Sequence, residues 1–481
     1  MPVIAEDVAE VETTTLRHSL ITALVVAFAI RLIVCAVDFR EPEGGLDSGY
    51  IQTSASLASG LGALMPSTTA NVSDVVSYMK QREAAGGRVD PEHPYPPDTR
   101  GWVPATQHPP GYALLLYSLY RATNYTWMIR LIHLIQAATD ALACLLVYLF
   151  LRNLFGSRSA LAGLWIYALL PSPIFLTLRL QPDAFSCFFA AAILALATFI
   201  PGGGLRYGLL TGAAVGVASQ FRTEFMLWSV IVLCALAVSS ISGLSKLRLG
   251  ATVLIAQFTI LIPWMFWAQR ATGHPLLVPS NGGSTMYQAL GEQPQNPWGI
   301  TLQDEWIEAD AVKRGFTSAW TLEADAYYRA AFYDSIRRHP VSFLKLIVID
   351  RLPVALIPPF NAGQPSRSGF SLWDFRRKEG LTRWGVTLKY PGLVLKNMWP
   401  TLLMALLSAM LLAGMLAVAI TYRRDWRRMA WIVIPWLLTV SALSFAKQIE
   451  PRNLSPIIVP EVAGVAFLVT RSRSGRKSLL A

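Results

Sequence analysis

Long apolar segments alternate with short basic segments along most of this chain. A helix that crosses a bilayer needs about 20 predominantly apolar residues. Segments of this kind lie near residues 18–38, 127–151, 158–178, 182–200, 205–221, 223–240, 247–269, 398–421, 428–446 and 453–470. The pattern therefore predicts an all-α polytopic membrane protein, whose helices are interrupted by two long loops at 39–126 and 270–397.

Composition and charge agree with this prediction. Of the 481 residues, 53% are hydrophobic and only 15% are charged, whereas soluble domains carry about 25% charged residues. The formal net charge is +11. Many of the basic residues lie in short loops between apolar segments, which indicates membrane topology rather than a nucleic-acid partner. The cysteines (Cys35, Cys144, Cys187 and Cys234) fall in or beside apolar segments and predict no disulfide framework.

The basic loops also set the expected orientation, because short cytoplasmic loops are enriched in Lys and Arg. Residues 1–17 are then a cytoplasmic N-terminus, and residues 18–269 form a first transmembrane module that includes the outer loop 39–126. Residues 270–397 form the second outer loop. Residues 398–481 supply the C-terminal helices and a basic cytoplasmic tail.

Two segments inside the outer loops have helical patterns of their own. Residues 341–359 are apolar but contain Lys345, Asp350 and several prolines, which favours an interfacial or re-entrant helix and leaves a full crossing open. Residues Val72, Val75, Val76 and Met79 have the spacing of an amphipathic helix that suits a bilayer surface.

Polar residues in or near the outer loops are candidates for chemistry. Asp47 follows the first helix closely, where a carboxylate can take a proton from an acceptor hydroxyl, although Asp47-Ser-Gly is also ordinary turn chemistry. Asp183 follows Pro182 at a helix start, which is typical of capping. A cationic set suited to a lipid phosphate lies on the same side: Arg100, His108, Arg222, Lys447 and Arg452. Structural ion pairs, such as Arg222 with Glu224, are the alternative for these cations.

Charged and small residues inside the apolar segments are candidates for helix contacts, with a functional role as the alternative for the charges and chance as the alternative for the glycines. Arg31 lies in the first predicted helix, and Asp140 lies deep in the second, where a charge needs a partner or a cavity. Gly208, Gly212 and Gly216 have the four-residue spacing that allows close helix packing in lipid.

Several motifs, in the same order along the chain, resemble those of the membrane-embedded GT-C glycosyltransferases. The resemblance is to the bacterial relatives of the protein O-mannosyltransferases and of the lipid A aminoarabinose transferase. The motifs are Asp47-x-x-Tyr50, His108-Pro-Pro-Gly-Tyr112, Arg152-Asn-Leu-Phe-Gly156, Gly212 to Arg222, Asn281-Gly-Gly283 with Tyr287, His339-Pro340, and Glu450-Pro-Arg452.

The resemblance implies a GT-C fold of about 11–13 transmembrane helices with periplasmic juxtamembrane helices. It implies inverting transfer of a sugar from a polyprenyl-phosphate donor to a hydroxyl of a lipid, glycan or protein, at the outer face of a bacterial plasma membrane. Asp47 becomes the general base and Asp183 a second carboxylate. The cationic set becomes the donor-phosphate site. Tyr50, Tyr112, Asn281 and Glu450 become candidates for the sugar and acceptor site.

The chain departs from the family pattern at defined positions. Ser48 replaces the usual second acid, His108 replaces a phosphate-binding lysine, and Asn453 replaces a tyrosine. The role of the long insertion 64–105 is left open, as is dependence on a divalent metal ion.

Two other function classes stay as alternatives, a lipid-linked glycan ligase or polymerase and a transporter or flippase. The chain lacks the two similar halves typical of many transporters, which disfavours the last.

Overall fold

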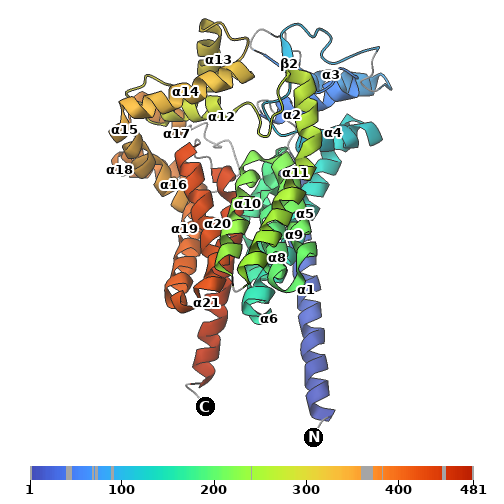
Figure 1. Cartoon of the computed structure of the whole chain (residues 1–481), viewed down its shortest axis with the longest axis vertical. Helices are drawn as coiled ribbons and strands as arrows, with labels where there is room; N and C mark the ends of the chain where they lie inside the picture. Colours follow the sequence, from blue (N-terminus) through green and yellow to red (C-terminus); the bar gives the residue numbers. More distant parts are fainter. Residues whose placement is uncertain are drawn as a thin grey trace.

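The computed structural model describes residues 3–39, 46–67, 70, 74–87, 92–239, 241–358, 372–381, 383–446 and 451–478. It consists of a bundle of long helices with a layer of shorter helices at one end, and both chain termini lie at the opposite end (Figure 1). Within the described residues, seven helices are long and apolar enough to cross a membrane. The protein is therefore a multi-pass, all-α membrane protein, as predicted.

The long helices of the bundle are α1 (Val3–Val37), α5 (Tyr125–Phe155), α8 (Ser186–Gly203), α11 (Gly243–Thr272), α19 (Pro391–Thr421), α20 (Trp426–Ala446) and α21 (Ile458–Ser478). Shorter helices complete it: α6 (Ser157–Leu169), α7 (Pro171–Leu176), α9 (Leu205–Phe221) and α10 (Met226–Val238). The predicted span 158–178 is broken between α6 and α7. Leu170 is extended, the conformation favoured before a proline.

Short 3-10 turns connect these helices at both ends of the bundle. They are η1 (Pro182–Phe185), η2 (Thr223–Phe225), η5 (Arg423–Asp425) and η6 (Pro451–Ile457). Three of them, η1, η2 and η6, lie at the end that carries the outer loops.

Helices α9 and α11 pack closely along the glycine stripe of α9. A Cβ atom at Gly212 would lie 2.2 Å from the backbone oxygen of Val253, and one at Gly216 would lie 2.7 Å from the Cβ of Ile260. Only glycine lets the two backbones approach this far. The prediction that these glycines form a packing face is confirmed.

A buried ion pair joins α1 to α5. Arg31 Nε lies 2.5 Å from Asp140 Oδ2, and both side chains are at most 1% exposed. The Tyr167 hydroxyl of α6 donates to Asp140 Oδ1 at 2.6 Å, and Arg31 also donates to the Ala168 carbonyl. Asp140 was predicted to need a partner, and the structure identifies that partner as Arg31. The cluster joins the three helices α1, α5 and α6.

The first outer loop forms a compact layer on the bundle. It contains α2 (Leu46–Ala58), α3 (Val75–Ala84) and α4 (Gly111–Ala122), with strands β1 (Leu64–Pro66) and β2 (Trp102–Pro104) paired antiparallel. The sequence did not predict these strands, because three residues are too few to reveal a strand pattern. The predicted amphipathic helix is α3, but its buried Val75 and Met79 pack within the protein rather than on a bilayer. Val72 lies outside the described residues.

The second outer loop is also helical. Its elements are α12 (Gly282–Gln288), η3 (Ala289–Glu292), α13 (Asp304–Lys313), α14 (Leu322–Arg338), α15 (Pro340–Lys345), the π-helical η4 (Leu346–Arg351), α16 (Leu352–Leu356), α17 (Leu372–Glu379) and α18 (Arg383–Lys389). Two of the charges in segment 341–359, Asp350 and Arg351, are buried in the protein, whereas Lys345 is exposed. Arg351 Nε lies 2.5 Å from Glu292 Oε2, both almost fully buried. Arg351 also donates to the carbonyls of Ser444 and Phe445 at the end of α20.

Candidate functional site

Two adjoining cavities lie beneath the outer layer. We call the first the apolar cavity, with a volume of about 560 Å³, and the second the polar cavity, with a volume of about 460 Å³. Both volumes are typical of small-molecule sites. The cavities meet at a junction, defined by the residues that line both: Tyr50, Gln107, His108, Pro109, Asp304 and Trp320.

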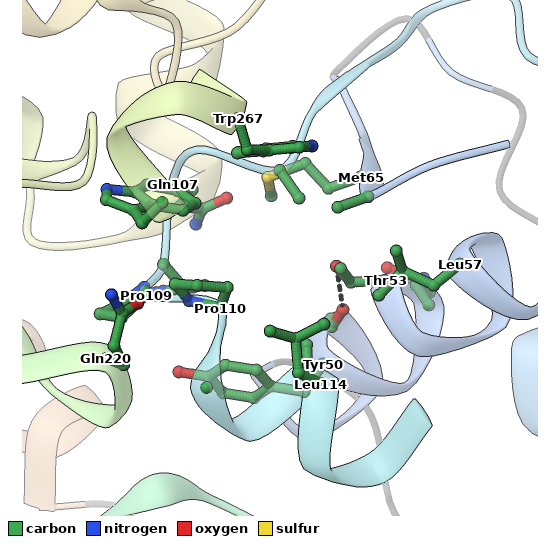
Figure 2. A pocket seen from close by; sticks show the side chains of 18 of the residues that line it. Tyr50, Thr53, Leu57, Met65, Gln107, Pro109, Pro110, Leu114, Gln220 and Trp267 are labelled. Atoms are coloured by element: carbon green, nitrogen blue, oxygen red, sulfur yellow. Dashed lines mark hydrogen bonds between the residues drawn. The ribbon is translucent and has the colours of Figure 1, made fainter. Parts of the chain in front are cut away.

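The apolar cavity lies between the first outer loop and α11. Trp267 and Met65 lie on one side of it, and Tyr50 and Leu114 lie on the opposite side (Figure 2). Met65 belongs to β1, so the insertion 64–105 supplies part of the wall. Next to Trp267, Phe266 is 65% exposed on the surface of α11, so this wall borders the apolar outside of the bundle.

The polar cavity is built around the guanidinium of Arg222, which is 8% exposed. Its Nη1 donates to Asp183 Oδ1, and its Nη2 donates to Asn453 Oδ1 and forms an ion pair with Glu224 Oε1. The predicted pair of Arg222 and Glu224 is therefore present. Burial of a charge requires such compensation, and here it brings η1, η2 and η6 together.

Arg452 is the second cation of the polar cavity. Its Nη1 donates to the side-chain oxygen of Gln181, which directly precedes η1. Lys447 and Glu450, the predicted neighbours of Arg452, lie outside the described residues.

Tyr50 stands at the junction and is held by two aromatic rings. Its ring centroid lies 5.3 Å from that of His108 and 5.1 Å from that of Tyr112, the latter edge-on. Tyr112 is fully buried, and its hydroxyl donates to Gln136 Oε1 at 2.9 Å. Tyr112 is not among the described residues that line the two cavities. It therefore packs against Tyr50 without facing a ligand.

Asp47 lies one turn before Tyr50 in α2. Positions three apart share a face of a helix, so the helical register places position 47 on the face that carries Tyr50. The side chain of Asp47 is outside the part of the chain that the structure describes.

Asn281 reaches the polar cavity because α12 packs tightly on α14. The Gly283 N–H donates to Asp325 Oδ1 at 2.5 Å. A Cβ atom at Gly283 would lie 2.0 Å from the Asp325 carbonyl oxygen. Gly283 of the Asn-Gly-Gly motif is therefore required, because a larger residue would prevent the close contact that places Asn281 at the polar cavity.

Helix α13 is fixed on α14 by a buried tyrosine. The Tyr328 hydroxyl donates to Asp310 Oδ2 at 3.0 Å. Burial, together with this hydrogen bond, raises the pKa of Tyr328 well above its ordinary value. The phenol therefore stays a donor and anchors the helix that begins at Asp304.

Arg100 is not brought to this site. Its side chain is 91% exposed and pairs with Asp98, with Nη2 2.6 Å from Oδ2. It is not one of the described residues that line the cavities. The prediction grouped it with the other cations because it shares their side of the membrane, but a local contact two residues away holds it at the surface.

Sequence reasoning missed Gln107, Asp304 and Trp320 at the junction. They lie in polar segments without periodicity, so their proximity depends on long-range packing. Among the described residues, no group of three or more His, Cys, Asp or Glu side chains is placed to hold a metal ion.

Residues 107–267 match the family of Dolichyl-phosphate-mannose-protein mannosyltransferases. The matched segment contains His108, Asp183 and Arg222. About a third of the chain is therefore similar to a family of mannosyltransferases. A comparison of the chain with curated protein sequences finds no significant match.

Two solved structures are similar to this chain. The archaeal oligosaccharyltransferase AglB from Archaeoglobus fulgidus, in complex with an inhibitory peptide and a dolichol-phosphate, is 12% identical with a TM-score of 0.49. The match covers 95% of this chain and 50% of AglB. ArnT from Cupriavidus metallidurans, bound to undecaprenyl phosphate, is 15% identical with a TM-score of 0.43, over 94% of this chain and 60% of ArnT. The chain thus spans only part of the length of each.

Proposed function

We propose that this protein is a glycosyltransferase that moves a sugar from a polyprenyl-phosphate donor to a hydroxyl acceptor, with inversion of the anomeric configuration. The observation that carries the proposal is the junction of an apolar cavity with a charged cavity. A polyprenyl-phosphate sugar has the same division, since an apolar chain is joined through a phosphate to a polar sugar. The apolar cavity suits the first prenyl units, and the polar cavity suits the glycosyl phosphate.

The donor phosphate is proposed to lie at the junction, near His108 and Arg452. Both line the polar cavity, and His108 lines both cavities. Cations at this position stabilise the negative charge that develops on the leaving phosphate. Arg222 contributes less directly, because its guanidinium already binds Asp183 and Glu224.

The proposed reaction is a single displacement. Asp47 takes the proton of the acceptor hydroxyl as its oxygen attacks the anomeric carbon. The bond from that carbon to the phosphate oxygen breaks, and polyprenyl phosphate leaves with the electron pair. Asp183, held by Arg222, supplies a second fixed carboxylate that orients the acceptor or sugar hydroxyls.

The proposed location is a bacterial plasma membrane, with the cavities facing the periplasm. Both termini lie at the end of the bundle away from the cavities (Figure 1). The positive-inside rule assigns the basic loops that contain Arg152, Arg206 and Arg424 to the cytoplasmic side.

Purified protein incubated with membrane lipid extract tests the proposal. Mass spectrometry should detect consumption of a polyprenyl-phosphate sugar, and NMR of the product should show an inverted anomeric centre. Consumption of diphosphate-linked oligosaccharide instead would favour a ligase or polymerase. Movement of an unchanged lipid-linked sugar across proteoliposomes would favour a flippase.

A further inference from the structure

The junction carries three side chains that the proposed reaction does not use. Gln107 lies between β2 and α4, Asp304 begins α13, and Trp320 precedes α14. Each of them lines both cavities. A ligand that extends from one cavity into the other therefore passes all three.

Two of these side chains offer hydrogen-bond acceptors to the ligand. Gln107 Oε1 is buried and has no hydrogen-bond partner among the described residues. Asp304 is exposed to the cavities, and its Oδ1 accepts a hydrogen bond from Gln288 Nε2 at 2.9 Å. A buried acceptor without a partner destabilises the protein, so a ligand that donates a hydrogen bond to Gln107 removes this penalty.

Trp320 adds an aromatic surface beside these acceptors. Small-molecule sites combine an apolar wall with a few placed polar groups. A sugar ring meets both requirements, because it presents hydroxyl donors at its rim and C–H groups on its faces.

One chain of hydrogen bonds fixes the junction. The hydroxyls of Thr106 and Ser280 lie 2.8 Å apart, and the Ser280 hydroxyl donates to the Trp320 carbonyl at 2.8 Å. The Ser280 N–H donates to the Thr106 carbonyl, also at 2.8 Å. Both hydroxyl side chains are buried. The segments that carry Gln107 and Trp320 are thus held together before a ligand arrives, which favours specific binding.

The charges left at the junction disfavour an anionic sugar. Asp304 contributes a carboxylate, Arg222 is already neutralised by Asp183 and Glu224, and the proposed donor phosphate engages His108 and Arg452. A uronic acid placed here would meet Asp304 without a further cation to compensate it.

We propose that Gln107, Asp304 and Trp320 form the sugar-recognition subsite, which accepts a sugar with hydroxyl or amino donors and rejects a uronic acid. This inference rests on the proposed function, because it names the class of sugar that the donor carries.

Binding titrations in detergent test the inference without requiring turnover. The probes are synthetic polyprenyl phosphates that carry no sugar, a neutral hexose or a uronic acid. The proteins are wild type, Asp304→Asn, Gln107→Leu and the matched control Glu305→Gln, whose exposed side chain is not among the described lining residues of either cavity. The quantity of interest is the affinity that the sugar adds to the bare phosphate.

The neutral hexose should raise the affinity of wild type and of Glu305→Gln equally. This increment should fall roughly tenfold in Asp304→Asn and Gln107→Leu, with unchanged affinity for the bare polyprenyl phosphate. The uronic acid should add nothing in wild type.

An equal increment in all four proteins would overturn the inference, as would a uronic acid that binds wild type as tightly as the hexose. If wild type binds none of the polyprenyl phosphates, the proposed function itself fails. If wild type binds the bare polyprenyl phosphate but the hexose adds no affinity, only the inference about the sugar fails.

Discussion

The ring of Tyr50 lies 5.3 Å from the ring of His108 at the point where the apolar and polar cavities meet. Tyr50 comes from α2 and His108 from the segment just before α4. Their contact joins the helix that carries Asp47 to the proposed phosphate site.

His108 should contribute to donor binding through its contact with the phosphate. A hydrogen bond to a charged group is worth about 1.5–3 kcal/mol, so His108→Ala should raise the KM for donor roughly tenfold or more. His108→Lys keeps a donor at this position and should stay close to wild type. Initial rates over a range of donor concentrations measure this. Equal KM values for His108→Ala and wild type would contradict a phosphate-binding role for His108.

Substitutions of Arg452 and Arg100 should have different effects on donor binding. Arg452 lines the polar cavity, whereas Arg100 is paired with Asp98 at the surface. A charge-assisted contact to phosphate is worth about 1.5–3 kcal/mol, so Arg452→Ala should raise the KM for donor roughly tenfold or more. Arg100→Ala is the control and should leave KM unchanged. Equal effects of the two substitutions would remove Arg452 from the proposed phosphate site.

The ion cluster around Arg222 should be structural as well as functional. Arg222→Met leaves the buried carboxylates of Asp183 and Glu224 without their cation. Breaking a buried pair from one side destabilises a protein by about 3–5 kcal/mol. Thermal unfolding in detergent should show a clear drop in Tm. The triple variant Arg222→Met, Asp183→Asn and Glu224→Gln should recover part of the loss, and no recovery would contradict the pairing.

Because α9 and α11 are in close contact, the addition of one methyl group at Gly212 should lower the stability of the protein. Gly212→Ala places a Cβ against the Val253 carbonyl, and overpacking of this kind costs about 1–3 kcal/mol. Gly202→Ala in α8 is the matched control, because nothing lies within 4 Å of its Cβ position. Thermal unfolding should show a lower Tm for Gly212→Ala alone. Equal Tm values for the two variants would contradict the packing.

The helical, multi-pass character of the protein was largely predictable because the length of the apolar segments determines it. The pairing of Arg222 with Glu224 was predictable from their spacing, and the need of Asp140 for a partner followed from its depth. The identity of that partner, Arg31, required the packing of α1 on α5.

The junction between the cavities was not predictable, because it assembles residues far apart in the sequence. Gln107 and Asp304 are brought together by α13, α14 and the contact of Thr106 with Ser280. The same limitation produced the error at Arg100, since residues on one side of a membrane need not converge on one site.

Donor binding and donor turnover by Asp47→Asn, measured together, test the central claim most directly. Asp38→Asn is the matched control, because it makes the same change near the end of α1. The account predicts that Asp47→Asn binds a polyprenyl-phosphate sugar as wild type does but loses roughly a hundredfold or more in turnover, while Asp38→Asn keeps both. Turnover by Asp47→Asn equal to that of wild type would contradict the claim and would favour the ligase or transporter alternatives.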